Sequence, residues 1–121
     1  MTHAELSEVF KRYHQETWPE RRIFPNRSGV AVYGKSLVPY GIPAPLLGKK
    51  KKAGGGGSDF ISLGPEGGYF TAWFFEVKTL NDTMKPNQRR WAKWVVSQGG
   101  KYWIVKEQPD RCFKLIAIHS I

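Results

Sequence analysis

Apolar positions recur with two different periods along this chain, and the change of period divides it into elements. Near the N-terminus four apolar residues have helical spacing: Leu6, Val9, Phe10 and Tyr13. Thr2 and Glu5 have the spacing of a capping box, so we expect a helix over residues 4–16. Residues 28–34 then form a short apolar, β-branched run, which predicts a strand.

A glycine-rich turn lies at the centre of the next predicted element. Residues 57–63 and 69–78 are rich in aromatic and β-branched side chains, and they flank the turn composition of residues 64–68. Two such runs joined by a short turn predict an antiparallel hairpin.

One helix and two strands are expected after the hairpin. Pro86 suits the first position of a helix over 86–98, and two glycines follow where that helix should end. Strands are expected at 101–105 and 112–121. The order α-β-β-β-α-β-β predicts an α/β fold with a mixed β-sheet flanked by helices, formed by residues 1–121 as a single domain.

The predicted hairpin brings charged side chains together at its open end. Folding the chain at about residue 66 places Asp59 opposite residues 74–76, and alternation puts Glu76 and Lys78 on one face. Carboxylate oxygens suit Mg²⁺, and a neighbouring lysine can stabilise developing charge on a phosphate. The pattern therefore indicates phosphodiester cleavage, with a structural ion pair between Glu76 and Lys78 as the alternative.

Two further polar residues are candidates for the same site. Gln88, at the third position of its helix, either caps the backbone or contacts Lys78, a water or a phosphate. In the first helix we favour Glu5 over Glu8 as a third carboxylate, because Glu5 lies nearer the apolar stripe. A capping role for Glu5 is the competing interpretation.

The net charge of +9 favours a polyanionic partner such as DNA. Residues at about 39–56 contain prolines, a lysine run and glycines, and predict a flexible loop. That lysine run is either a solvated segment or a basic flap that closes on DNA. The candidate DNA-binding cations are Lys49, Lys50, Lys51, Lys52, Arg89, Arg90 and Lys93.

Cysteine content and aromatic placement bear on the setting of the chain. Cys112 is the only cysteine, which favours a reducing, intracellular and cytoplasmic compartment. No apolar stretch is long enough to span a membrane. Trp73 and Phe75 are expected on the strand face away from Glu76, where exposed aromatic surface would suit an interface between two copies.

Several of these residues together resemble the VRR-NUC family, the virus-type replication-repair nucleases of the PD-(D/E)XK superfamily. The resemblance rests on Gly57-Ser58-Asp59, on Glu76-Val77-Lys78, on Asn81-Asp82 and on Gln88-Arg89-Arg90-Trp91. The chain departs from the family pattern at three positions, where Pro, Gly and a helix-capping Ser or Thr are common: Ser58, Thr79 and Lys85.

The resemblance implies a restriction-endonuclease-like core and DNA cleavage that depends on Mg²⁺ or Mn²⁺. Asp59 and Glu76 would bind the metal together with the Val77 carbonyl and Glu5. Lys78 would be the catalytic lysine and Gln88 would support it. Short members of the family look like Holliday-junction resolvases that act as homodimers on branched DNA, in the nucleoid or on viral DNA. The alternatives are a non-catalytic nucleic-acid-binding module and a general or site-specific nuclease of the same fold.

Overall fold

The computed structural model describes residues 1–26, 29–40 and 58–119 of the chain. The elements in these residues follow one another in a mixed order of helices and strands: α1 (His3–Thr17), β1 (Arg22–Pro25), β2 (Gly29–Tyr33), β3 (Ser36–Tyr40), β4 (Phe60–Glu66), β5 (Tyr69–Lys78), α2 (Pro86–Ser97), β6 (Lys101–Glu107) and β7 (Phe113–Ala117).

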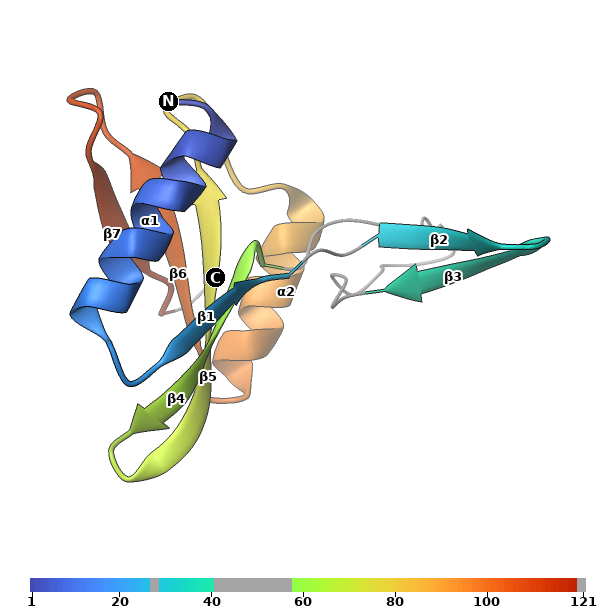
Figure 1. The fold of residues 1–121 in the computed structure, drawn as a ribbon, viewed down its shortest axis with the longest axis horizontal. Helices are drawn as coiled ribbons and strands as arrows, with labels where there is room; N and C mark the ends of the chain where they lie inside the picture. The colour runs from blue at the N-terminus through green and yellow to red at the C-terminus, as the bar shows by residue number, and fades with distance from the viewer. Residues whose placement is uncertain (27–28, 41–57, 120–121) are drawn as a thin grey trace.

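Five of the strands form a mixed sheet in the order β1-β4-β5-β6-β7. β5 and β6 are parallel and are connected through α2, whereas the other neighbouring strands of the sheet are antiparallel. α1 and α2 lie on opposite faces of the sheet (Figure 1). This arrangement confirms the predicted α/β fold with a mixed sheet between helices.

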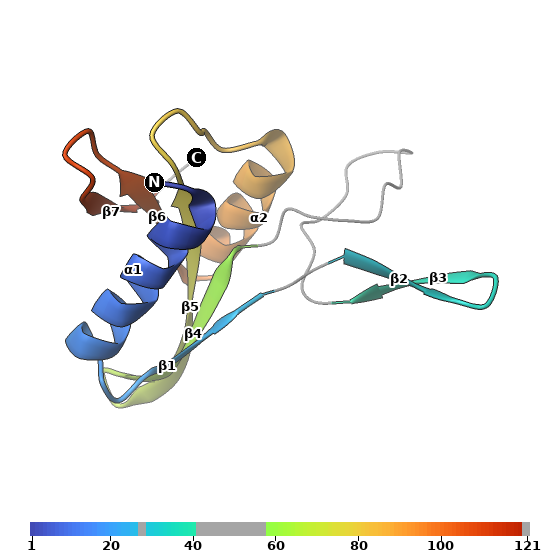
Figure 2. The ribbon, with the colours of Figure 1, turned by 45° about the horizontal axis from the view of Figure 1, so that its top comes forward.

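β2 and β3 pair with each other in a separate two-stranded sheet. The pair projects from the five-stranded sheet as an arm (Figures 1 and 2). β3 occupies the beginning of the stretch predicted to be a flexible loop, and the rest of that stretch, including Lys49 to Lys52, lies outside the described residues.

The predicted order of elements missed β1 and β3. β1 has only four residues and ends in Pro25, so its sequence carries little strand signal. Its conformation comes from antiparallel pairing with β4, in which Ile23 lies opposite Ser62. The five-residue β3 contains Pro39 and is set by its pairing with β2 in the same way.

The core beneath α1 contains the aromatic residues that we expected at an interface. Trp73 is 6% exposed and Phe75 is fully buried, and both pack in one cluster with Leu6 and Phe10 of α1. Phe10 and Phe75 have ring centroids 4.7 Å apart. The prediction of exposed aromatic surface on this face of β5 was therefore wrong, because α1 covers it.

The buried stripe of α1 ends in a histidine. Leu6, Phe10 and His14 are buried at intervals of one helical turn, whereas Val9 and Tyr13 of the predicted stripe remain substantially exposed. His14 Nε2 lies 2.7 Å from Ser62 Oγ, and His14 Nδ1 lies 3.2 Å from Gln15 Oε1. Burial lowers the pKa of His14, and the charge of Arg21 lowers it further.

We expect stability to fall at acidic pH through His14. A group whose folded pKa lies below its unfolded value stabilises the fold above the unfolded pKa, here near 6.5, and loses that contribution as pH falls. The free energy of unfolding should therefore decrease more steeply from pH 7 to pH 5 for the wild type than for His14→Gln. Urea denaturation of both proteins across this range measures their free energies of unfolding. A difference between the two proteins that stays constant with pH would contradict the prediction.

Arg21 is the largest side chain that is fully buried, and it ties β4 to β5. Its guanidinium donates to Ser62 Oγ and Ser62 O at 2.9 Å and to Thr71 O at 2.8 Å. It also lies 3.5 Å from the centre of the Trp73 ring. A Cβ atom at Gly64 would lie 2.7 Å from Arg21 Cγ, so the absence of a side chain at Gly64 makes room for this arginine.

Candidate active site

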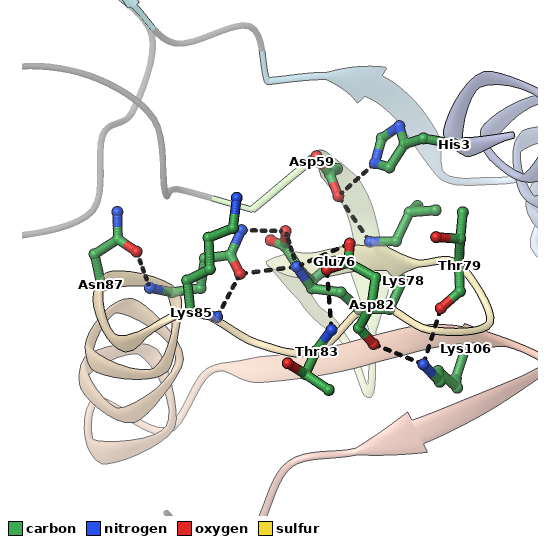
Figure 3. A network of polar contacts seen from close by, with 12 residues as sticks. His3, Asp59, Glu76, Lys78, Thr79, Asp82, Thr83, Lys85, Asn87 and Lys106 are labelled. Carbon is green, nitrogen blue, oxygen red and sulfur yellow. Dashed lines mark hydrogen bonds and ion pairs between the residues drawn. The ribbon is translucent and has the colours of Figure 1, made fainter.

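The register of the β4–β5 hairpin brings Asp59 beside Glu76. Phe60 pairs with Phe75, so Asp59, one residue before β4, reaches the level of Glu76 at the open end of the hairpin. Asp59 Oδ2 accepts a 2.7 Å hydrogen bond from the backbone N–H of Val77. The structure thus agrees with the expected position of Asp59 opposite residues 74–76 (Figure 3).

Glu76 is a carboxylic acid buried among polar partners. Its side chain is 2% exposed, and it accepts hydrogen bonds from Gln88 Nε2 at 2.9 Å and from Tyr102 Oη at 3.1 Å. Burial, together with the negative charge of Asp59, raises the pKa of Glu76 to about 8. Since ligation requires the ionised carboxylate, a cation bound at Glu76 would displace a proton at neutral pH.

Lys78 lies beside Glu76 on the same face of β5, as strand alternation predicts. Its side chain is 4% exposed. Lys78 Nζ is 2.8 Å from Gln88 Oε1, 3.6 Å from Glu76 Oε1 and 3.6 Å from Asp82 Oδ2. The ammonium therefore lies among two carboxyl groups and an amide oxygen at the end of β5 (Figure 3).

Gln88 connects the start of α2 to this network. Its Oε1 accepts from Lys78 Nζ and, at 2.9 Å, from the backbone N–H of Lys85, while its Nε2 donates to Glu76. Both interpretations considered for Gln88 hold at once, because one oxygen caps the helix and also contacts Lys78. The amide is thus fixed in one orientation, with its oxygen toward the ammonium and its nitrogen toward the carboxylate.

Two adjacent residues of β6 form hydrogen bonds that hold the loop between β5 and α2 in place. Lys106 Nζ donates to three backbone carbonyls, those of Thr79, Leu80 and Asp82, at 2.9, 3.0 and 2.6 Å. Glu107 Oε1 accepts from Leu80 N at 3.2 Å. These bonds set the position of the loop that presents Asp82 to Lys78.

Replacing Lys106 with Met should loosen this loop without touching the carboxylates. Three carbonyls would lose their shared donor, at a cost of roughly 1–3 kcal/mol for groups left unsatisfied. We expect a lower unfolding midpoint and faster amide hydrogen exchange at residues 79–82, as measured by mass spectrometry. Lys114→Met, on the neighbouring strand β7 where the lysine is exposed, is the matched control and should leave both quantities unchanged.

Glu5 does not join the carboxylate pair in the structure. Its carboxylate accepts from the backbone N–H of Thr2 at 3.0 Å, in a complete capping box at the start of α1. The structure therefore shows the competing capping role for Glu5, and a role for Glu5 as a third metal-binding acid stays a prediction. Glu8 instead lines a cavity of about 360 Å³ together with His3 and Asp59. His3 Nε2 lies 3.3 Å from Asp59 Oδ2, a contact that no sequence pattern predicted.

The donor set at the end of the hairpin suits a hard divalent cation. Asp59 and Glu76 supply carboxylate oxygens close enough for one charge to shift the pKa of the other. Within the described residues, no group of three or more His, Cys, Asp or Glu side chains is gathered as a preformed metal site. The remaining ligands would thus be backbone carbonyls, substrate oxygens or water molecules. Mg²⁺ commonly retains several of its waters when it binds to a protein.

The candidate DNA-binding cations of α2 have different exposures. Arg89 and Lys93 are exposed, whereas Arg90 is half-buried. Arg89 lines the same surface cavity as Lys78 and Asp82 of the polar network. In the part of the chain that the structure describes, no helix is long and apolar enough to cross a membrane.

The family model of the VRR-NUC domain matches residues 38–108, which is more than half of the chain. This chain belongs to the VRR-NUC family. That membership supports a nuclease-type, hydrolytic function and agrees with the restriction-endonuclease-like fold. No curated protein and no solved structure matches the chain.

Two departures from the usual VRR-NUC pattern leave the polar network intact. Lys85 stands where a capping Ser or Thr is common, and Gln88 Oε1 satisfies its backbone N–H from within α2. Thr79 stands where Gly is frequent, and its carbonyl is one of the three bound by Lys106. In this VRR-NUC domain the start of α2 and the preceding loop are therefore held by side chains of α2 and β6.

Proposed function

We propose that this protein is a divalent-metal-dependent, structure-selective DNA endonuclease. The observation that carries the proposal is the network formed by Glu76, Lys78 and Gln88, in which a buried carboxylate and a buried ammonium share one glutamine. If Glu76 and Lys78 formed only a structural ion pair, the raised pKa of Glu76 and the second carboxylate at Asp59 would have no role.

Asp59, Glu76 and the Val77 carbonyl would hold Mg²⁺ or Mn²⁺. When bound, such an ion supplies an activated water and neutralises charge on the phosphate. Glu8 replaces Glu5 as the first-helix acid in this proposal, because it shares a cavity with Asp59.

Lys78 is the residue that would stabilise the negative charge developing on the scissile phosphate. Gln88 fixes the ammonium by its 2.8 Å contact, so Lys78 loses little freedom when substrate arrives. Arg89, Arg90 and Lys93, together with Lys49 to Lys52 of the segment before β4, would bind the DNA backbone. Such phosphate contacts are independent of sequence and weaken as salt concentration increases.

The specific activity that we propose is resolution of branched DNA by a homodimer. Two symmetric nicks in a four-way junction need two active centres, and two copies of a chain with one such network supply them. Support for the dimer comes from this geometry and no longer from Trp73 or Phe75, which α1 buries.

The deciding experiment is cleavage of a labelled four-way junction and of the matching linear duplex, with Mg²⁺, Mn²⁺ or EDTA. We expect metal-dependent paired nicks in the junction, with a dimer in light scattering when DNA is present. Cleavage of both substrates would instead identify a general nuclease, and cutting at one defined sequence a site-specific one. Tight binding with no cleavage in any metal would favour the non-catalytic binding module.

A further inference from the structure

A cleft of about 540 Å³ opens beside Lys78 on the face of the sheet that carries α2. Its volume falls within the range of roughly 300–1,000 Å³ that is common for small-molecule sites. Lys78, which belongs to the polar network, and Arg89 are among the residues that line the cleft. The cleft and the candidate active site therefore share a residue and form one continuous surface.

Most of the other lining side chains are apolar, and the polar residues Asp82, Thr83 and Lys106 complete the lining. Ile104 of β6 and Ile116 of β7 line it together with Ile118 and Met84. Ile116 is 37% exposed, because α2 packs on Phe74 and Tyr102 and leaves this part of the sheet uncovered. No aromatic residue is among the described residues that line the cleft.

We propose that this cleft takes the base of an unpaired nucleotide adjacent to the scissile phosphate. The proposal rests on the proposed function, and it names the feature of branched DNA that the site would select. An anionic ligand is favoured, because the exposed Arg89 lines the cleft and the chain carries a net charge of +9, whereas the charge of the buried Lys78 is offset by Asp82 at 3.6 Å. The ligand must also have an apolar part that isoleucine side chains can bury.

An unpaired nucleotide has both properties, whereas a paired base is held in the stack and cannot enter a cleft without being flipped out of the duplex. An aliphatic floor buries a base without reading its hydrogen-bonding edge, so this contact discriminates structure and not sequence. Lys106 also lines the cleft. Its ammonium donates hydrogen bonds to three carbonyls of the loop between β5 and α2, so it holds this loop in place at the edge of the cleft.

The first test places 2-aminopurine at the unpaired position next to the cleavage site of a flap or junction, with EDTA present. Leaving the stack for an aliphatic cleft should raise its fluorescence when the protein binds. The same base within a paired arm should show no increase. An equal response at the two positions would overturn the proposal.

The second test fills the cleft. Ile116→Trp should abolish the fluorescence increase, and it should remove the preference for a normal nucleotide over an abasic one at that position. For the wild type we expect this preference to be about tenfold in cleavage rate, as burial of part of a base would give. Val9→Trp, at an exposed position of α1 on the opposite face, is the control and should retain both effects.

The outcomes separate this inference from the function on which it rests. Absence of cleavage on every substrate would refute the nuclease proposal, while the fluorescence test would still decide whether the cleft receives a base. Cleavage with equal rates for normal and abasic substrates would refute the cleft alone. If Ile116→Trp instead turned a dimer into a monomer in sedimentation, the cleft would belong to an interface between two copies.

Discussion

Replacing Lys78 with Met should reduce DNA cleavage by at least about 100-fold, which is the usual effect of removing one donor that stabilises transition-state charge. Met keeps most of the aliphatic stem and removes only the ammonium. In the structure that ammonium is buried between Glu76 and Asp82 and is fixed by Gln88. Single-turnover cleavage at saturating protein isolates this step from DNA binding.

DNA affinity should change little in Lys78→Met, because a side chain that is 4% exposed contributes little to backbone contacts. Lys85→Met is the matched control, since Lys85 is an exposed lysine at the start of α2. It should cleave at nearly the wild-type rate. A Lys78→Met variant that is folded by circular dichroism and cleaves normally would remove Lys78 from the proposed mechanism.

Replacing Arg21 with Met should cost about 3–5 kcal/mol of unfolding free energy, as expected when one partner of a buried charged network is removed. The guanidinium donates to backbone carbonyls of Ser62 and Thr71 and to the hydroxyl of Ser62. Without it these buried acceptors lose a charged donor, although Ser62 Oγ keeps its contact with His14, and the Trp73 ring loses the cation 3.5 Å from its centre. Urea denaturation monitored by tryptophan fluorescence measures the loss.

The neighbouring Arg22 supplies the control for this prediction. Arg22 is exposed and, among the described residues, donates to the nearby carbonyls of Pro19 and Arg21, so Arg22→Met should cost less than about 1 kcal/mol. Gly64→Ala should reproduce part of the Arg21 effect, because the added Cβ would displace the arginine stem. Equal unfolding midpoints for the two arginine variants would show that the buried network is not what holds the hairpin.

The hairpin and its charged residues could be predicted from sequence because they depend on local rules. A glycine-rich turn fixes the register, and strand alternation then fixes the common face of Glu76 and Lys78. Gln88 was predictable for the same reason, since its position within α2 follows from Pro86. These features need no knowledge of which strands lie beside the hairpin.

The features that were missed depend on contacts between distant parts of the chain. Arg21 lies among three consecutive charged residues, 20–22, which carry no signal of burial, yet it is 1% exposed beside the pairing of β1 with β4. Trp73 and Phe75 looked exposed because nothing in their own strand indicates where α1 packs. Glu5 fits both a cap and a ligand by spacing, and only the position of Asp59 beside His3 and Glu8 separates the two roles.

The side chains that contact Glu76 and the loop between β5 and α2 also determine when the site can form during synthesis on the ribosome. Tyr102, Lys106 and Glu107 all belong to β6, which is translated after both carboxylates, the lysine and Gln88. A nascent chain that ends before residue 101 lacks the parallel neighbour of β5 and these three contacts. The polar network is therefore completed only after β6 has been translated, so chains released earlier lack the finished site.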